Sequence, residues 1–270
     1  MIKQKIFLLS IPLIFYFLPI FSQNGSHMAF EDGEIVEYKA YYNWNFVWLY
    51  AGDVTFTVDE TTYEGLPVYH LEAQGNTIKS YEWLYKVDDY FQSYVDKNNF
   101  QPVYYERNTN EGKYSVHNRY EFNHNENYIF SRTENSKKPY EEDLISYSQP
   151  LFDVLSAIYY SRNIPYDTLN KDEKIPLPMI VDNELYDLYL RYRGKEKIDV
   201  RDIGEFNCIK FTAKLVEGTI FKGGEHLTVW VTDDKNRIPV IVEAKILVGS
   251  VKAIFRSADN LKYPSPLSSY

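Results

Sequence analysis

Alternating side chains, interrupted by short turns, are the feature of this sequence that most constrains its fold. Val36, Tyr38, Ala40 and Tyr42 fall on one face of an extended chain, and the residues between them fall on the other. A two-residue period is typical of a half-buried β-strand. Tyrosine, at 26 residues, and an aromatic content of 17% strengthen the strand prediction. The same alternation recurs in residues 54–59, 114–122 and 209–215.

Short, turn-forming segments separate these runs. Parallel strands need crossover connections of roughly a dozen residues or more, whereas short turns join antiparallel neighbours. We therefore expect an antiparallel sheet. The turn segments are residues 63–65, 96–99, 108–112, 123–127, 193–194, 217–218 and 233–236.

One segment has a helical pattern, at about residues 150–162. Its apolar residues Leu151, Val154, Leu155 and Ile158 share one face of a helix. Ser148 is the expected N-terminal cap, and Asn163 and Pro165 are expected to end the helix.

The order of these segments predicts a mainly β protein with one β-rich domain over residues 30–257. Two β halves, 30–135 and 174–257, are joined by a loop and the helix. A strongly curved antiparallel sheet, forming an open or half-closed barrel around the helix, and a two-sheet sandwich both fit. We favour the curved sheet, because the strand runs are long and Gly75, Gly204 and Gly249 stand where bends or bulges would help. Residues 134–142 are expected to be an exposed loop, and 258–270 a loose tail.

Residues 1–23 have the pattern of an export signal, with Lys3 and Lys5 before an apolar run that ends at Ser22. Prolines interrupt that run, which favours a cleaved signal over the alternative, a membrane anchor. We expect no membrane span after cleavage, and a periplasmic or extracellular, soluble location. The only cysteine, Cys208, is too far from the signal to carry a lipid, and we expect it to be a small buried residue. The segment 25–28 resembles a cloning scar and is set aside.

The net charge limits the partners of the mature chain. The formal charge is −9, and removal of the two signal lysines makes it −11. An acidic surface repels phosphate backbones and anionic head groups, so we expect no nucleic-acid partner and no charge-driven membrane adsorption.

Several short motifs follow one another over most of the mature chain. They are Gly33-Glu34 with Tyr38, Ala51-Gly52, Val87-Asp88-Asp89-Tyr90, the helical segment 153–160, Gly204-Glu205-Phe206-Asn207-Cys208, and the segment 229–234 with Arg237-Ile238-Pro239. In this order they resemble the domain of unknown function 3108 family of bacterial exported proteins. The resemblance implies an envelope protein with a β-rich fold, and it brings no established activity, cofactor or catalytic residue.

No catalytic, metal or cofactor motif is predicted. Asp233 and Asp234 could ligate calcium, but their context favours a hairpin turn in which Arg237 pairs with one of them. A glycoside hydrolase needs two facing carboxylates. The acids considered for that role are Asp88, Asp89, Glu72 and Asp153. The histidines His27, His70, His117, His124 and His226 lack paired metal-ligand spacing.

Aromatic residues are the remaining candidates for a binding site. Rings of this size fill cores, but in a partly open barrel they would also line a space suited to an apolar ligand. We predict a non-enzymatic envelope protein. Its expected partner is a lipid-like or other apolar small molecule, or a second envelope protein. The alternative is a carbohydrate-binding or carbohydrate-active protein that uses exposed tryptophans and paired carboxylates. The predicted ligand-binding residues are Tyr38, Tyr42, Trp44, Trp48, Trp83, Tyr90, Tyr120 and Trp230.

Overall fold

A single antiparallel sheet of 14 strands forms the body of the protein in the computed structural model, which describes residues 28–44, 47–200, 202–216, 224–246 and 249–269. The predicted signal peptide lies outside these residues. The strands are β1 (Glu34–Trp44), β2 (Val47–Tyr63), β3 (Leu66–Thr77), β4 (Val87–Asp96), β5 (Pro102–Glu111), β6 (Tyr114–Asn123), β7 (Tyr128–Asn135), β8 (Lys138–Ser146), β9 (Lys174–Val181), β10 (Glu184–Val200), β11 (Gly204–Leu215), β12 (Gly224–Thr232), β13 (Pro239–Lys245) and β14 (Ser250–Asp259).

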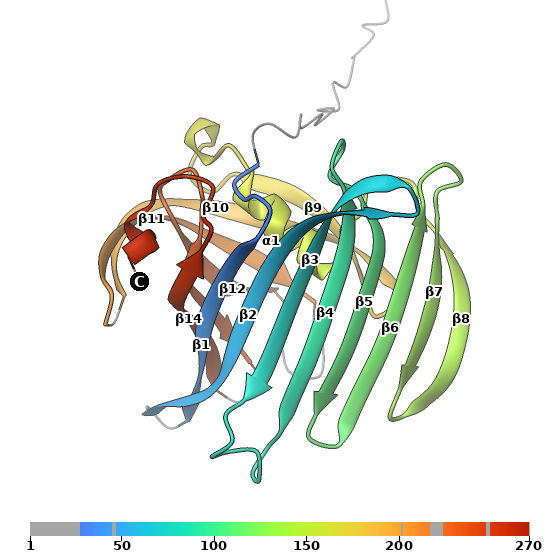
Figure 1. Ribbon diagram of the computed structural model, residues 1–270, viewed down its shortest axis with the longest axis horizontal. Helices are drawn as coiled ribbons and strands as arrows, with labels where there is room; N and C mark the ends of the chain where they lie inside the picture. Colours follow the sequence, from blue (N-terminus) through green and yellow to red (C-terminus); the bar gives the residue numbers. More distant parts are fainter. Residues whose placement is uncertain (1–27, 45–46, 201, 217–223, 247–248, 270) are drawn as a thin grey trace, which may run out of the picture.

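The strand order shows how the two β halves combine. It runs β8-β7-β6-β5-β4-β3-β2-β1-β14-β13-β12-β11-β10-β9, so β1 pairs with β14 and the sheet ends at β8 and β9. In Figure 1, β1–β8 form the front wall, and β9–β12 lie behind the helix α1. The predicted curved antiparallel sheet with one α-helix is confirmed. Two short 3-10 turns, η2 (Tyr166–Thr168) and η3 (Pro266–Ser269), complete the described elements.

The helix α1 (Val154–Arg162) begins later than the sequence predicted. Its cap is Asp153 and not Ser148. The Asp153 carboxylate accepts from the Ser156 amide, and the Ser156 side chain accepts from the Asp153 amide, which is a complete capping box. The preceding residue, Phe152, is extended and pairs with Met179 of β9. Asn163 ends the helix, as predicted.

Three buried clusters contain residues of α1. Leu155 and Tyr159 pack against β2, β3 and β4, next to Met28 and Phe30. On its other side, Ala157 belongs to a cluster of residues from β9–β12. Burying both sides of one helix between two parts of the same sheet explains why the sheet curves around it. Met28 is therefore a core residue, although the sequence pattern suggested that it be set aside.

The strand β9 lies inside the curve. Ile180 packs in one cluster with Tyr105 and Tyr120 of β5 and β6. In the next turn, the Asn183 amide donates to the Tyr120 hydroxyl at 3.1 Å, and Ser131 of β7 donates to the Asn183 side chain at 2.7 Å. One edge of the sheet is thus rolled against the inner face of β5–β7. We call the face of the sheet that contacts α1 and β9 the inner face, and the opposite one the outer face.

Two segments that were predicted to be irregular are ordered. Residues 138–146 form β8, paired with β7, and not part of an exposed loop. Nearly every β8 side chain is exposed, so the strand lacks the apolar alternation that would reveal it. The C-terminal segment is not loose either. Leu267 is fully buried, and Tyr263 and Asn236 exchange two hydrogen bonds.

The three glycines that were predicted to bend the strands do not form bulges within them. Gly75 sits in regular register between Val54 and Asp89, and Gly204 begins a strand. Gly249 lies in a turn, where its φ of +86° suits glycine. Irregular register occurs instead at positions such as Gly194 in β10. Gly52 has a separate role, because a Cβ there would lie 2.4 Å from the Asn76 carbonyl oxygen.

The buried Asp153 predicts a pH dependence of stability. Burial raises its pKa to about 6, although hydrogen bonds from Ser156 and Ser93 oppose this. Between about pH 4 and 6 the folded protein therefore binds more protons than the unfolded chain, and stability falls as the pH rises. We expect Asp153→Asn to remove roughly 2–3 kcal/mol of this fall. Urea unfolding at pH 4 and pH 7 measures it. An unchanged pH slope in the variant would contradict the prediction.

Candidate functional site

Rows of paired residues cross the inner face, and their chemistry changes along the sheet. The register places Val36, Phe56, Ala73, Phe91 and Arg107 side by side on β1–β5. The parallel row next to it runs through Phe255, Tyr38, Val54, Gly75 and Asp89. Both rows are apolar up to β3 and gain charged residues at β4 and β5. The inner face therefore has an apolar part and a polar part.

The apolar part is incompletely buried. Six inner-face residues are only half-buried although they lie within the curve of the sheet, and we call them the inner floor: Ala40, Val54, Phe56, Phe91, Val242 and Ala253. Ala40 pairs with Ala253 on one side and Gly52 on the other. A barrel interior is normally filled by large side chains, whereas small residues occupy these adjacent positions.

Charged side chains border the inner floor at β4 and β5. Arg107 donates to the Asp182 carboxylate at 3.0 Å and to the Thr109 hydroxyl at 3.3 Å. Burial, and then the nearby Glu111 carboxylate, raise the pKa of Asp89 to about 6. A polar group of a ligand would find both a guanidinium and a carboxyl at this border. We call Asp89, Arg107 and Asp182 the polar border.

Among the surface pockets of the described part of the chain, two lie away from the inner floor. One, of about 360 Å³, lies at the ends of β10–β12 and is lined by Tyr186, Leu188 and Leu215 among others. The other, of about 250 Å³, is lined by charged residues that include Arg162, Lys235 and Arg237. The first pocket lies next to the residue pair Leu190 and Ala213, on the side of Leu188 of β10 and Leu215 of β11.

Three of the predicted ligand-binding residues lie on the inner face. Tyr38 is buried, and its ring meets those of Phe56 and Phe255 edge to face at 5.8 and 6.4 Å. Tyr42 is half-buried, two positions beyond Ala40. Tyr120 is buried and stacked on Tyr105 under the β9 turn. Tyr38 and Tyr42 thus border the inner floor, whereas Tyr120 belongs to the core.

The other predicted residues do not join them. Trp48 and Trp230 lie on the outer face, where Lys252 and Lys210 cover one side of each ring at 4.5 and 5.1 Å. Tyr90 also points outward and donates to Glu72. Trp83 lies in the β3–β4 connection with its side chain 80% exposed. The side chain of Trp44 lies outside the described part. The expectation that these rings line one interior space is corrected for Trp48, Tyr90, Trp83 and Trp230.

The acids considered for glycoside hydrolysis are separated by the sheet. Glu72 lies on the outer face, while Asp89 lies on the inner face of the neighbouring strand. Asp153 is engaged in capping α1, and Asp88 is exposed. No two of these four form a facing pair across a common space.

Asp233 and Asp234 lie in the β12–β13 turn. The Asp234 carboxylate accepts from the amides of Asn236 and Arg237, as a tight turn requires. Arg237 contacts Asp234 through the backbone, because its Nε donates to the Asp234 carbonyl oxygen at 3.1 Å, and its ion-pair partner is Asp167 at 3.6 Å. Cys208 is fully buried, and burial raises its pKa to about 12, which leaves the thiol unreactive.

Sequence reasoning missed the inner floor as a binding surface. None of its six residues was predicted to bind a ligand, and Arg107 was not considered. The phase of alternation in each strand was a usable signal for the apolar residues. Arg107 lies two positions after the buried Tyr105, so both side chains point to the inner face of β5. A charged residue among side chains that point inward is unusual and marks a candidate binding residue.

The comparisons with known proteins agree with this architecture. The model of a family described as "Protein of unknown function (DUF3108)" matches residues 37–256. The chain belongs to the DUF3108 family. A crystal structure titled as a beta-barrel-like protein of domain of unknown function DUF1849 from Brucella abortus has a similar fold, with a TM-score of 0.55 at 7% identity over 86% of this chain and 98% of that chain. No curated protein matches the chain.

One buried ion pair joins segments that lie in or next to three of the motifs by which the chain resembles the DUF3108 family. Arg162, at the end of α1, donates to both carboxylate oxygens of Glu34 at 2.5 and 2.8 Å. It also donates to the carbonyl oxygens of Asn236 and Ala29 at 3.0 and 3.1 Å. One guanidinium therefore links β1, α1, the β12–β13 turn and the segment before β1.

No described helix is long and apolar enough to cross a membrane.

Proposed function

We propose that this DUF3108 protein is an exported, non-enzymatic envelope protein that binds an apolar or amphipathic small molecule, such as a lipid, against the inner floor. The observation that carries the proposal is the inner floor itself. Its apolar residues face the inside of the sheet but stay half-buried, so water contacts them in the free protein. Covering such surface with apolar ligand atoms is favourable by roughly 25 cal/mol per Å².

The polar border supports an amphipathic ligand over a fully apolar one. A ligand whose chain covers Val54, Phe56 and Phe91 would place its polar end near Arg107 and Asp89, which follow directly in the two rows. Polar groups near a desolvated site bind best when they meet hydrogen-bonding partners. An anionic end would pair with Arg107, and a hydroxyl or amide end with either residue.

The glycan alternative has less support from the same coordinates. Sugar rings stack on open aromatic faces, and Lys252 and Lys210 lie over the rings of Trp48 and Trp230. Trp83 keeps an exposed ring, and its indole N–H donates to the Ser80 carbonyl oxygen at 2.9 Å. One open ring without facing carboxylates is a weak glycan site. Glycan binding stays a prediction from sequence.

A matched pair of tryptophan substitutions tests the proposal. Ala253→Trp adds a large ring to the inner floor, whereas Thr55→Trp adds the same ring to the outer face. We expect Ala253→Trp to weaken binding of a fluorescent fatty acid at least tenfold and Thr55→Trp to leave it within about twofold. Because Ala253 is only half-buried, we also expect Ala253→Trp to escape most of the roughly 1–3 kcal/mol cost of overpacking.

Fluorescence titration measures the affinity, and urea unfolding measures the stability of both variants. Organic extraction of the wild-type protein followed by mass spectrometry identifies a bound ligand. Equal probe affinity in the two variants, or no saturable binding by the wild type, would refute the proposal.

A further inference from the structure

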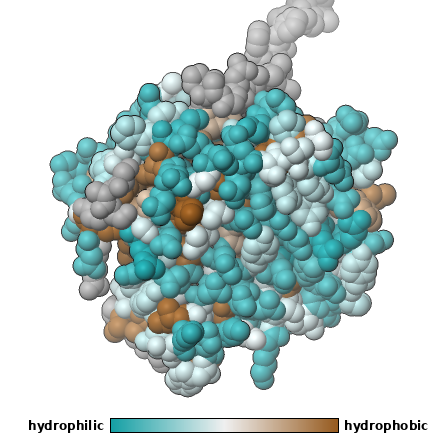
Figure 2. Space-filling model, in the orientation of Figure 1, coloured by the Kyte–Doolittle hydropathy of each residue, from teal (hydrophilic) through white to brown (hydrophobic). Residues whose placement is uncertain are grey.

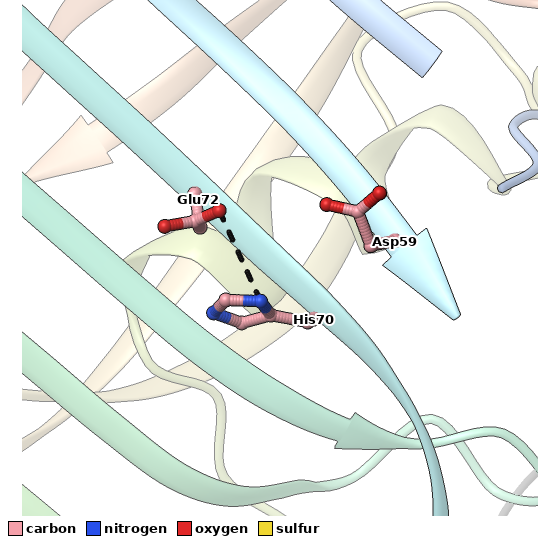
Figure 3. Close-up of side chains that lie close together, drawn as sticks. All are labelled: Asp59, His70 and Glu72. Atoms are coloured by element: carbon pink, nitrogen blue, oxygen red, sulfur yellow. Dashed lines mark ion pairs between the residues drawn. The ribbon is translucent and has the colours of Figure 1, made fainter. Parts of the chain in front are cut away.

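Asp59, His70 and Glu72 form a cluster on the outer face that no catalytic or binding role has been given. Asp59 lies on β2, directly opposite His70 of β3, and Glu72 follows His70 on the same face of β3. One ligand atom from each lies within 4.8 Å of the others. Figure 3 shows the three side chains at the corners of a triangle, with His70 Nδ1 3.9 Å from Glu72 Oε2. Strand pairing brings the three together.

A chain of hydrogen bonds determines which nitrogen of His70 carries the proton. Burial alone would raise the pKa of Glu106, but hydrogen bonds from His117, Gln92 and Tyr104 outweigh it and hold that pKa below its ordinary value. Glu106 is therefore an acceptor, and the Gln92 amide nitrogen donates to it at 2.7 Å. The Gln92 oxygen then faces His70 Nε2 at 3.1 Å and can only accept a hydrogen bond, so His70 Nε2–H is the donor. In the neutral imidazole, Nδ1 keeps a lone pair.

The cluster is held in this orientation by residues outside it. The His70 ring stacks on Tyr94 with 4.5 Å between centroids and 14° between planes. The Tyr90 hydroxyl donates to Glu72 Oε1, which leaves Oε2 toward His70. Metal-ligating histidines and carboxylates are oriented in this way by outer hydrogen bonds, which also make the histidine a better ligand.

We propose that Asp59, His70 and Glu72 bind one divalent transition-metal ion of the Zn²⁺ type. The three ligand atoms, one nitrogen and two carboxylate oxygens, lie within 4.8 Å of one another, and their lone pairs repel unless a proton or a cation lies between them. One histidine with two carboxylates is a donor set that Zn²⁺ accepts, with water in the fourth position. Bonds of roughly 2.0–2.2 Å to the metal require the side chains to close inward slightly.

The site is independent of the inner floor. It lies on the opposite face of the sheet, and the exposed side chain of Asp59 leaves it open to solvent. Figure 2, in the orientation of Figure 1, shows a mainly hydrophilic surface over β1–β8. An ion bound here would tie β2 to β3 and would not contact a ligand inside the sheet.

Cobalt and zinc titrations of the tag-free mature protein test the proposal. Co²⁺ reports an N/O site by its visible absorption, and Zn²⁺ should displace it with a 1:1 stoichiometry. We expect His70→Gln and Glu72→Gln to weaken Zn²⁺ binding at least tenfold. His124→Gln is the matched control, because His124 bonds to the Pro102 carbonyl oxygen and Tyr147 away from the cluster, and we expect no change.

Thermal melting keeps the test independent of folding defects. Zn²⁺ should raise the Tm of the wild type and of His124→Gln, and should leave the Tm of His70→Gln unchanged. If the three side chains only contact one another and bind no ion, the wild type will show no saturable Co²⁺ absorption. That outcome, or equal Zn²⁺ affinity in the wild type and His70→Gln, would overturn the proposal.

Discussion

Arg162→Met is expected to lower the free energy of unfolding by about 3–5 kcal/mol. The substitution keeps much of the apolar stem of the side chain but leaves Glu34 without its partner. Glu34 is 0% exposed and Arg162 only 4%, so water cannot replace the lost charge. Two backbone carbonyl oxygens, of Asn236 and Ala29, lose their donors at the same time. Urea unfolding at pH 7 measures the effect.

Two controls separate the buried pair from charge in general. Replacing both partners, Glu34→Met with Arg162→Met, should recover at least half of the lost stability, because no unpaired charge then stays buried. Arg256→Met should change stability by less than about 1 kcal/mol, since Arg256 is exposed and lies 3.6 Å or more from Asp53 and Glu37. A loss below 1 kcal/mol for Arg162→Met would show that the pair is not needed for stability.

Phe30→Ala is the second substitution with a large expected effect, again about 3–5 kcal/mol. Phe30 is 0% exposed, and its ring contacts those of Tyr69 and Tyr159 edge to face at 5.2 and 5.1 Å. Its removal leaves a cavity between α1 and β3. The Arg162 guanidinium also lies over the Phe30 ring, 5.5 Å from its centre. Chemical denaturation, followed by far-ultraviolet circular dichroism, measures the loss.

The matched control for this prediction is Phe130→Ala. Phe130 is half-buried on the outer face, where Arg132 covers its ring at 4.3 Å. We expect that variant to lose about 1 kcal/mol or less, because the outer face can rehydrate without forming a cavity. A loss for Phe30→Ala as small as the one expected for Phe130→Ala would contradict the prediction that the segment before β1 stabilises the core.

Alternation and turn spacing were enough to predict the fold class. Each extended run with a two-residue period, such as residues 36–42 and 114–122, is a strand. The prediction failed where local pattern and tertiary role disagree. The strand β8 has almost no buried face and so no alternation to detect. Ser148 had the right chemistry for a cap, but Phe152 pairs with β9 and delays the helix to Asp153.

The candidate sites were harder to predict, because they depend on contacts between residues far apart in sequence. The local sequence shows that Trp230 points to the opposite face of β12 from Val229 and Val231, but it does not show which of the two faces is the inner one. Only the packing of those valines near α1 shows that Trp230 faces outward. Likewise, Arg107 and Asp182 meet only because β9 is rolled inside the sheet.

The sequence by itself determined that this chain forms antiparallel strands around one helix, because side-chain period and turn length are local properties. The tertiary structure decided which phase of each strand faces inward, and hence that Val54, Phe56 and Phe91 form a floor while His70 and Glu72 lie on the opposite face. The physical reason is that alternation makes the two faces of a strand different without saying which one the rest of the chain will cover.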